Sequence, residues 1–388
     1  MASYIMQKNE TNHHLIWVEL NKKALLKNLQ TFRSLLGSEV KFCPVVKSNA
    51  YGHGAQAAAL MIQASGMADW LAVNSVDEGL ELRRQGIKLP LLVLGYIPLD
   101  RLSDAVLHDL RLTVYNQETV AKLRTLRTNK KIFLHIKIET GTNRQGVDLK
   151  GALQLAKMIK GSRNLRLEGY STHFANIEDT TDRSFAGRQL QRYQKMLAEL
   201  EQKGFKAPVN HIACTAASLV FPQTRLQLAR IGIGLYGLWP SRETMVSLKE
   251  QNSKLALQPV MSWKTRVAQV KTVAAGEYIG YGCTFRTSRK TRIAVLPVGY
   301  YDGYDRKLSN TAYVLIKGKR APIRGRVCMN LCMADITDIP GVRPEDEVVL
   351  LGKQGKEQVS AEQLAQWIGT INYEVVTRIN PNLPRVVV

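Results

Sequence analysis

The sequence has no long run of apolar residues, and this absence argues against a helical membrane protein. No run approaches the roughly 18 residues that a membrane-spanning helix needs. The first residues, MASYIMQKNETNHH, also lack the apolar stretch and the small-residue cleavage site of a secretory signal. We therefore expect a cytoplasmic protein without a membrane partner.

Cysteine is scarce, and its pattern excludes two kinds of small-domain framework. The chain has 5 cysteines in 388 residues. An odd number argues against a disulfide framework, and the absence of any CxxC pair argues against a zinc cage. We expect reduced thiols, as in the cytosol, and no metal site.

Acidic residues are few compared with basic ones. The chain carries 54 Lys and Arg against 32 Asp and Glu, a formal net charge of +22. The basic residues are spread along the chain, and the densest clusters, RTLRTNKK and RTSRKTR, contain no aromatic residues between the charges. Such clusters match no nucleic-acid-binding motif. We interpret the charge as solvated surface that attracts anionic ligands over a distance and expect no nucleic-acid partner.

Short apolar runs alternate with amphipathic stretches over residues 41–237. The predicted strands are KFCPVV, WLAVNS, LPLLVLG, RLTVYN, KIFLHIKIE, RLEGYSTHF, PVNHIAC and LQLARIGIGLYG. Between them lie helical patterns such as SVDEGLELRRQG and RQLQRYQKMLAELEQKG, which ends on Gly204. This alternation predicts a (β/α)8 TIM barrel at residues 12–250. A doubly wound sheet is the alternative, although it usually needs fewer repeats.

The pattern changes after about residue 250. Strands such as VMSWKTRVAQVKTV, TRIAVLPVGY, AYVLIKG and DEVVLLG follow one another without a long helix. We predict a separate C-terminal, mainly-β domain at residues 251–388, with SLKEQNSK as the linker. A helix should follow at SAEQLAQWIG, where Ser360 and Gln363 have the spacing of a capping box.

Lys47 in VVKSNAYGHG follows an apolar run directly, which is unusual for a lysine. Lysine ammonium groups are almost never fully buried unless they are paired or reactive. One interpretation is a lysine at a strand end whose head reaches water. The other is an amine held in a pocket for covalent chemistry, as in Schiff-base enzymes.

Polar residues stand at the ends of several other predicted strands. Lys137 lies near the end of the fifth strand with Arg144 just beyond it, His173 ends the sixth, Thr215 follows the seventh and Arg230 lies in the eighth. A lone histidine at such a position is more often structural. Because barrel active sites form at the carboxyl ends of the strands, we expect this group to converge on one rim.

The segment GIGLYG matches the pattern GxGxxG, yet its context does not fit a dinucleotide site. It precedes LWPSRE, which is not a helical pattern, and no acidic residue stands at the expected spacing. In a barrel, the loops after strands seven and eight often bind phosphate, which suits Thr215, Gly232 and Ile233. A lysine amine and a phosphate cradle are the two anchors of pyridoxal 5′-phosphate.

Several motifs together resemble those of the alanine racemase family: VVKSNAYGHG, STHFA, ARIGIGLYGL, GYGCTF and GRVCMN. Their order and spacing match from about residue 14 to 386. The resemblance implies a barrel with a β domain, pyridoxal 5′-phosphate, a homodimer with shared active sites, and a cytoplasmic isomerase that interconverts L- and D-alanine for peptidoglycan.

The resemblance also implies roles for individual residues. Lys47 would hold the cofactor and act with Tyr281 as the two catalytic bases. Arg144 and Met329 would bind the substrate carboxylate, with Tyr281 beside them. The implied cofactor-binding residues are Lys47, Tyr51, Arg144, His173, Thr215, Arg230, Gly232 and Ile233, and His211 would support the site.

Three positions depart from the family pattern. Asn330 follows Cys-Met where the family commonly has Asp, Pro381 stands where several members have a tyrosine at the entrance, and Thr215 replaces a common serine. A hydroxyl remains at Thr215. The other two changes leave open a broader-specificity racemase or a serine racemase. A barrel decarboxylase with the same cofactor is a further alternative, but that class needs an acid where Arg230 stands.

Lys137 and Arg144 raise a question of charge, because both side chains are donors only. Either Lys137 faces away from Arg144, or an anion lies between them. The family resemblance supports the second interpretation, since several members carbamylate the matching lysine and others bind chloride there. We expect a carbamate on Lys137 or a bound anion.

Overall fold

The computed structural model describes residues 6–7, 14–251 and 254–388, and the chain divides into two compact units. The barrel unit comprises residues 26–50 and 58–258. The β unit comprises the described residues up to 25, together with 51–57 and 259–388. The short segment 51–57, which directly follows the VVKSNA stretch, therefore belongs to the β unit rather than to the barrel unit.

Parallel strands form the centre of the barrel unit. The strands are β3 (Lys41–Pro44), β4 (Leu71–Val73), β5 (Leu91–Val93), β6 (Leu110–Val114), β7 (Ile132–Lys137), β8 (Leu165–Ser171) and β9 (Leu228–Ile231). Strands β4 to β8 pair in sequence order, and β3 pairs with β9. A parallel bridge between Val45 and Ala72 joins the two sheets on one side. Strands buried on both faces read as short continuous apolar runs, which explains why β4 and β5 were recognisable in the sequence.

The seventh predicted strand, PVNHIAC, is not a regular strand in the structure. This prediction was wrong in detail, because residues 208–214 form only an isolated parallel bridge between His211 and Ser171. The segment still closes the ring. Its Val209 N–H donates to Glu168 at 3.0 Å, and its Ala213 carbonyl accepts from Arg230 N at 3.1 Å. Pro208 has no N–H to donate, which limits a ladder at the start of this segment.

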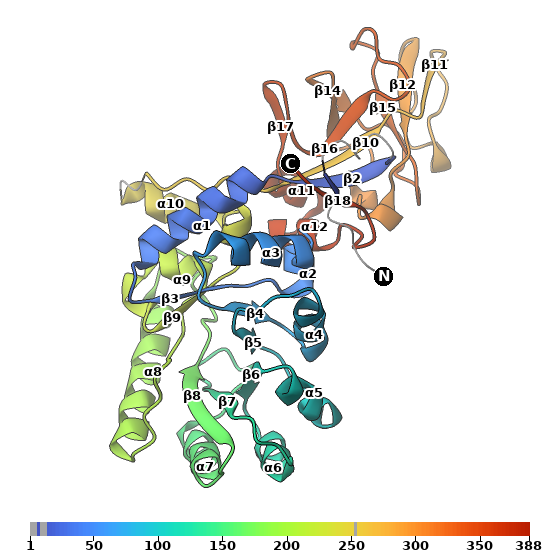
Figure 1. The fold of residues 1–388 in the computed structure, drawn as a ribbon. Coiled ribbons are helices and arrows are strands. Elements are labelled where there is room, and N and C mark those ends of the chain that lie inside the picture. Colours follow the sequence, from blue (N-terminus) through green and yellow to red (C-terminus); the bar gives the residue numbers. More distant parts are fainter. Residues whose placement is uncertain (1–5, 8–13, 252–253) are drawn as a thin grey trace. The chain divides into compact units, whose positions relative to one another are not determined.

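Helices lie outside these strands (Figure 1). They are α1 (Lys22–Leu36), α3 (Ala55–Ser65), α4 (Val76–Arg84), α5 (Leu102–Leu107), α6 (Gln117–Thr125), α7 (Leu149–Lys160), α8 (Ser184–Gln202), α9 (Thr215–Val220) and α10 (Arg242–Glu250), of which α1 and α3 begin in the β unit. Helix α4 begins with a complete capping box between Ser75 and Glu78. Helix α8 is followed by Gly204 at φ +79°, as the stop signal in the sequence predicted.

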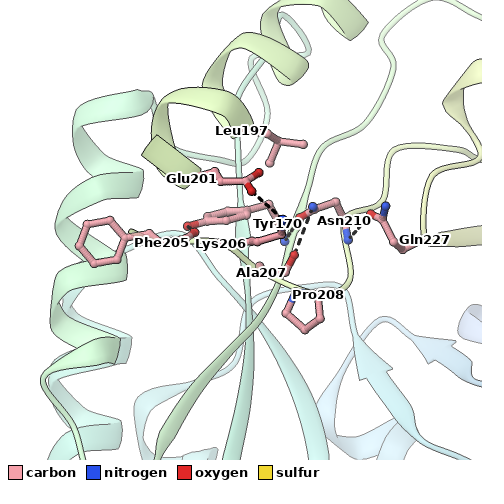
Figure 2. Close-up of a pocket in the computed structure, with 9 residues that line it drawn as sticks. All are labelled: Tyr170, Leu197, Glu201, Phe205, Lys206, Ala207, Pro208, Asn210 and Gln227. Carbon is pink, nitrogen blue, oxygen red and sulfur yellow. Dashed lines mark hydrogen bonds and ion pairs between the residues drawn. The ribbon is translucent and has the colours of Figure 1, made fainter. Parts of the chain in front are cut away.

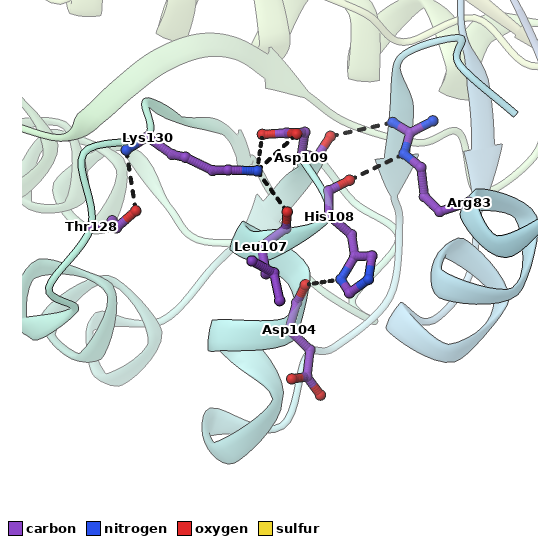
Figure 3. A network of polar contacts seen from close by, with 7 residues as sticks. All are labelled: Arg83, Asp104, Leu107, His108, Asp109, Thr128 and Lys130. Carbon is purple, nitrogen blue, oxygen red and sulfur yellow. Dashed lines mark hydrogen bonds and ion pairs between the residues drawn. The ribbon is translucent and has the colours of Figure 1, made fainter. Parts of the chain in front are cut away.

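A polar network fixes the turn between α5 and β6 (Figure 3). Asp109 adopts a positive φ of 53° there. Lys130 Nζ contacts both carboxylate oxygens of Asp109, at 2.9 and 3.0 Å, and donates to the Leu107 carbonyl at 2.6 Å. Arg83 Nε donates to the carbonyl of His108 at 3.1 Å. These contacts hold the amino ends of β6 and β7, which begin just after Asp109 and Lys130. We therefore assign this network a structural role.

The β unit contains two sheets. The larger has the order β1-β18-β2-β10-β16-β13-β14, with β17 paired to β16, and the smaller has the order β11-β12-β15. Their bounds are β1 (Met6–Gln7), β2 (Ile16–Leu20), β10 (Met261–Arg266), β11 (Gln269–Val273), β12 (Thr291–Leu296), β13 (Tyr313–Ile316), β14 (Lys319–Pro322), β15 (Cys332–Asp335), β16 (Glu347–Gln354), β17 (Glu357–Val359) and β18 (Arg385–Val387). Helices α11 (Ala361–Ile368) and α12 (Asn372–Thr377) follow the sheets in sequence before β18.

Two local predictions in this part of the chain need correction. Ser360 caps α11 by accepting from Gln363 N, but the Gln363 side chain donates to the Tyr313 hydroxyl at 2.9 Å instead of returning to the cap. The predicted linker SLKEQNSK begins inside α10, because Leu248 is buried and keeps the helix going to Glu250. Residues 252–253 of that linker lie outside the described residues. Among the described residues, no helix is long and apolar enough to cross a bilayer.

Candidate active site

A cavity of about 460 Å³ opens at the carboxyl ends of the barrel strands. It is lined by Lys47, Asn74, Leu94, Thr113, Lys137, Arg144, Gln145, Ser171, His173, His211 and Arg230. The lining thus contains lysines, arginines and histidines but no carboxylate among the residues that the structure describes. A cavity with this charge favours an anionic ligand.

Lys47 does not end a strand, as the sequence suggested, but starts the unusual turn α2 (Lys47–Tyr51). Strand β3 already ends at Pro44. The residues from Ser48 to Tyr51 all have φ near +53°, which is the left-handed region. Each such residue costs about 1–2 kcal/mol when it is not glycine, and strain of this kind is concentrated at functional sites.

Backbone hydrogen bonds help to hold this left-handed turn. Ala50 N–H donates to the Val46 carbonyl at 2.9 Å, and Ser48 N–H donates to a carboxylate oxygen of Glu78 at 2.6 Å. The turn fixes the backbone of Lys47 at the cavity. Burial, reinforced by the cations of Arg144 and Arg230, lowers the pKa of Lys47, and Glu78 opposes this shift. More of its amine is therefore neutral and nucleophilic at neutral pH.

Gly52 follows this turn, within the segment that belongs to the β unit, and its carbonyl accepts hydrogen bonds from Arg385 Nε and Nη2 at 3.3 and 3.1 Å. Its φ is +82°, and a Cβ atom at this position would lie 1.9 Å from the carbonyl oxygen of Val376. Glycine is therefore required here both for its conformation and for space. Beside it, the ring of Tyr51 lies 6.1 Å from the ring of Tyr373.

We expect Gly52→Ala to destabilise the protein far more than Gly37→Ala. Gly37 also has a positive φ, of +72°, but a Cβ atom there would meet nothing within 4 Å. The control should lose about 1 kcal/mol, the lower end of what a left-handed conformation costs a residue that has a Cβ atom. Gly52→Ala should lose more than about 2 kcal/mol, because overpacking adds a further cost. Urea denaturation of the two variants measures the difference, and equal losses would contradict the close approach to Val376.

Thr215 and the GIGLYG segment meet at one point of the barrel unit. Thr215 begins α9, and its hydroxyl oxygen accepts from Gly232 N–H at 2.9 Å. Gly232 precedes the 3-10 helix η4 (Ile233–Tyr236), so no α-helix follows the glycines, and a Rossmann arrangement is excluded. At Gly234, a Cβ atom would lie 2.5 Å from Thr215 Cγ2, which explains a glycine there.

Arg230 lies in β9 and is 5 % exposed. Its Nη2 donates to the Thr172 carbonyl at 3.0 Å and to the Ile212 carbonyl at 3.2 Å. Its Nη1 contacts Nδ1 of His211, and Nη2 lies 3.5 Å from Nδ1 of His173. Arg230 is thus fixed in the cavity wall as a cation that cannot release a proton.

The two histidines of the cavity are held neutral. Burial is the main cause that lowers the pKa of both His173 and His211. The second cause is Lys137 for His173 and Arg230 for His211, since a nearby cation disfavours a second positive charge. Neutral imidazoles accept as well as donate hydrogen bonds, so these residues are able to orient the donor groups around them.

Lys137 ends β7 and lines the same cavity as Arg144. The alternative in which Lys137 faces away from Arg144 is therefore not what the structure shows. Burial, together with Arg230 and Arg144, lowers the pKa of Lys137 well below its usual value. The lowered pKa raises the share of neutral amine, which is the form that reacts with carbon dioxide.

Tyr281 and Met329 belong to the β unit, where both side chains are largely exposed. Tyr281 begins the 3-10 helix η5 (Tyr281–Cys283) and is 74 % exposed. Met329 is 55 % exposed, and its carbonyl accepts from Tyr301 N–H at 3.0 Å. A carboxylate only accepts hydrogen bonds, so the backbone group of Met329 that would be suited to it is the N–H. The cavity is formed by barrel-unit residues, and the joining of Tyr281 and Met329 to it is part of the proposal below.

Sequence reasoning missed several polar residues of the cavity. Asn74, Thr113 and Ser171 lie at or near the ends of β4, β6 and β8, and Gln145 follows Arg144. The rule that barrel sites form at the carboxyl ends of strands would have found the first three. They were passed over because short polar side chains at strand ends are common in turns.

A second cavity, of about 240 Å³, lies elsewhere in the barrel unit (Figure 2). Its polar side chains form hydrogen bonds and an ion pair with other residues of the cavity wall. The Tyr170 hydroxyl donates to the Phe205 carbonyl at 2.9 Å, and Lys206 pairs with Glu201 at 2.6 Å. Asn210 N–H donates to the Gln227 side chain at 3.1 Å. Because these groups bond to one another, the first cavity is the better candidate.

Comparison with known proteins matches most of the chain. Residues 20–240 match the family model described as alanine racemase, N-terminal domain, and residues 260–387 match alanine racemase, C-terminal domain. Alanine racemase 1 of Caldanaerobacter subterraneus subsp. tengcongensis is 42 % identical over 372 residues, which cover 95 % of this chain and 94 % of the relative. Alanine racemase of Leptospira interrogans is 38 % identical over 375 residues, covering 96 % and 95 %.

Solved structures agree with this result. The alanine racemase of Clostridium difficile 630 superposes with a TM-score of 0.90 at 34 % identity and covers 97 % of this chain and 96 % of that one. Alanine racemase from Bacillus anthracis with bound L-Ala-P gives a TM-score of 0.89 at 35 % identity, covering 97 % and 95 %.

The barrel, the β unit and the cationic cavity define an isomerase that depends on pyridoxal 5′-phosphate and acts on an amino acid. The chain belongs to the alanine racemase family. The fold class, the isomerase class and the cofactor predicted from the sequence are thereby confirmed.

The residues present fit this cofactor. Lys47 has a lowered pKa, and the cavity that it lines carries an excess of positive charge, which suits an aldehyde and a phosphate. The Thr215 hydroxyl, which accepts from Gly232, still has its own proton to donate to a phosphate oxygen. Lys47, Tyr51, Arg144, His173, Thr215, Arg230, Gly232 and Ile233 are the residues predicted to hold it.

Proposed function

We propose that this chain interconverts L- and D-alanine by exchanging the α-proton between the two faces of Cα. Bound pyridoxal 5′-phosphate supplies an electron sink that makes the α-proton of an attached amino acid acidic. The observation that carries the proposal is that Lys47, whose pKa is lowered, lines the same cavity as the buried Arg230.

Two bases are needed, because the proton leaves one face and returns to the other. The Lys47 amine exchanges the α-proton on the face of Cα that gives D-alanine. The Tyr281 phenolate exchanges it on the opposite face, which gives L-alanine. An ordinary phenol has a pKa of about 10, so Tyr281 needs activation. We assign that role to His173, itself coupled to Arg230 through the 3.5 Å contact between Nδ1 and Nη2.

Arg230 separates racemisation from the competing reactions of this cofactor. We infer that its guanidinium would face the ring nitrogen without giving it a proton, because an arginine side chain stays protonated in proteins. The electron sink is then weaker than with an acid at this place, which suits simple proton exchange. A weaker electron sink disfavours the alternative of a barrel decarboxylase.

The substrate carboxylate is assigned to Arg144 and the backbone N–H of Met329. A pocket between Tyr281, Met329 and the barrel rim should admit alanine and, more slowly, serine, because one small group usually discriminates by about 1–3 kcal/mol. Racemisation of L-alanine, L-serine and L-lysine, followed by chiral chromatography, tests the proposal. Faster turnover of lysine than of alanine would show a wider entrance, to which Asn330 and Pro381 would then contribute.

We further propose the predicted organisation of the chain. The catalytic barrel would span residues 12–250 and the β domain residues 251–388. The enzyme would act in the cytoplasm, where D-alanine for peptidoglycan is made, and as a homodimer in which the partner supplies Tyr281, Cys328 and Met329. The support for the dimer is the family resemblance together with the exposure of Tyr281 and Met329.

A mixing experiment tests the shared site. Inactive Lys47→Ala and inactive Tyr281→Ala subunits are combined and allowed to exchange. Each mixed dimer then contains one site with both native bases, so racemase activity should return. Exchange that is proven by differently tagged subunits but restores no activity would show that each site is built from one chain.

We propose that Lys137 carries a carbamate, or faces a bound anion, that holds Arg144. Either species would accept charge-assisted hydrogen bonds from the guanidinium. The lowered pKa of Lys137 supports this assignment, since only the neutral amine reacts with carbon dioxide.

Lys137→Ala should lose most of its racemase activity and regain part of it when acetate or chloride is added. The added anion would occupy the position of the carbamate beside Arg144. Lys131→Ala is the control, because Lys131 precedes the same strand but is exposed, and its activity should not respond to these anions. Electron density for a bare Lys137 amine with no anion near Arg144 would refute the proposal.

A further inference from the structure

A row of polar side chains, three of them buried and the last, Glu168, partly exposed, runs through the barrel unit away from the cavity. Arg230 Nη1 contacts His211 Nδ1. On the other side of that ring, His211 Nε2 lies 3.0 Å from Nδ1 of His135. His135 Nε2 in turn lies 3.1 Å from Glu168 Oε2. The other carboxylate oxygen of Glu168, Oε1, accepts from Arg111 Nε at 3.1 Å. We call Glu168, His135, His211 and Arg230 the buried relay.

The packing around His135 shows that this row is built into the fold. Gly169 faces the ring, and a Cβ atom there would lie 2.3 Å from His135 Nδ1. The pairing of β7 with β8 shifts between Leu134 and His135, so that His135 pairs with Gly169. The His135 ring also lies nearly perpendicular to the Trp70 ring, with centroids 5.6 Å apart. The strand register and a glycine thus make room for one imidazole.

The donors and acceptors in the buried relay can point in only one direction. A guanidinium has donors only, so Nδ1 of His211 has to accept. A neutral His211 then carries its proton on Nε2 and donates to His135 Nδ1. His135 carries its proton on Nε2 as well and donates to the Glu168 carboxylate. Burial is the first cause that lowers the pKa of both histidines, which agrees with neutral rings.

We propose that Glu168 and His135 are positioning residues, which act through His211 to hold the Arg230 guanidinium in place toward the cavity. The carboxylate accepts the last proton of the row and thereby selects the tautomer of each histidine. Two carbonyls and His211 then fix the plane of Arg230. With five N–H donors, the guanidinium has further N–H groups to face the cavity. This inference deepens the proposed function and rests on it for the role of Arg230.

Nitrogen NMR of histidine-labelled holoenzyme tests the tautomers directly. We expect both His135 and His211 to be neutral with the proton on Nε2, and we expect the same tautomers in the protein without cofactor. A proton on Nδ1 of His211, or an imidazolium at either position, would overturn the proposal. This measurement does not depend on turnover, so failure to racemise alanine would reject the proposed function while leaving the relay standing.

Glu168→Gln removes the charge at almost the same volume. Arg111 needs the amide oxygen as its acceptor, so the amide NH2 faces His135 Nε2. His135 Nε2 then has to accept, and the protons of both His135 and His211 have to move to Nδ1. We expect changed nitrogen shifts at both histidines and a fall in kcat of about 10- to 100-fold, by analogy with the hydrogen-bond partners of metal-bound histidines. KM for alanine should change little. Unchanged shifts and unchanged kcat would contradict the proposal.

Matched variants guard against a general loss of structure. Glu201→Gln changes a glutamate of the same unit that pairs with Lys206 (Figure 2) and lies outside the buried relay, so its histidine shifts and kcat should match the wild type. His135→Gln is able to accept from His211 and donate to Glu168, whereas His135→Leu does neither. His135→Gln should keep the His211 tautomer and most of the turnover, and His135→Leu should lose both. Equal behaviour of the two would overturn the relay.

Discussion

Lys47→Ala is expected to abolish racemisation and to lose the visible absorbance of the bound cofactor. The loss of one base alone costs about 100- to 10,000-fold in rate, and the covalent anchor is lost as well. Lys41→Ala is the matched control, because Lys41 is exposed at the start of the strand that leads to Lys47. It should keep both colour and activity.

The position of the anchor can be mapped in the same experiment. Reduction with borohydride makes the link between cofactor and lysine permanent, and a digest then shows which peptide carries the added mass. We expect the peptide that contains Lys47 in the wild type and no labelled lysine in Lys47→Ala. A labelled Lys137 peptide would overturn the assignment of the two cavity lysines.

Tyr281→Phe is expected to keep the cofactor but to lose racemisation by about 100- to 10,000-fold, the contribution of a positioned base. The ring is retained and only the hydroxyl is lost. Because Lys47 still serves its own face, exchange of the α-proton should survive better for one enantiomer than for the other. This asymmetry distinguishes a missing base from a general loss of structure.

Tyr278→Phe provides the control for this change. Tyr278 is 54 % exposed and lies three positions before Tyr281, with its ring beside the Arg286 guanidinium. Its hydroxyl has no role in the account, so activity should match the wild type. Racemisation in both directions at the wild-type rate by Tyr281→Phe would rule out Tyr281 as the second base.

The barrel was predictable because some of its strands, such as β4 and β5, are buried along their whole length. Runs such as LPLLVLG have no other explanation in a chain that alternates strand and helix patterns. The exception is residues 208–214, where Pro208 and Asn210 interrupt the regular ladder. Single bridges and tertiary packing hold this segment, and local sequence patterns do not report them.

The cavity was predictable only in outline. The strand-end rule grouped Lys137, Arg144, His173, Thr215 and Arg230, and all of them except Thr215 line the cavity. The left-handed turn after Lys47 was not predictable. Of the residues Ser48, Asn49 and Ala50, only the asparagine adopts that conformation readily on its own. Tertiary contacts, among them the bond from Ser48 N–H to Glu78, stabilise it.

The buried relay was also beyond sequence reasoning. His135 sits in the middle of an apolar strand, where a lone histidine is usually a satisfied core residue. Its partners are separated from it by 33 and 76 positions in the chain. Only the shifted register of β7 and β8 brings these groups into line.

The central claim is that the chain exchanges the α-proton of alanine through two bases. Proton NMR of L-alanine incubated with the holoenzyme in D2O measures this directly. The α-proton signal should disappear while D-alanine forms, and the product enantiomer should carry deuterium at Cα from its first appearance. Loss of alanine to a decarboxylated amine, or an α-proton signal that persists, would contradict the account.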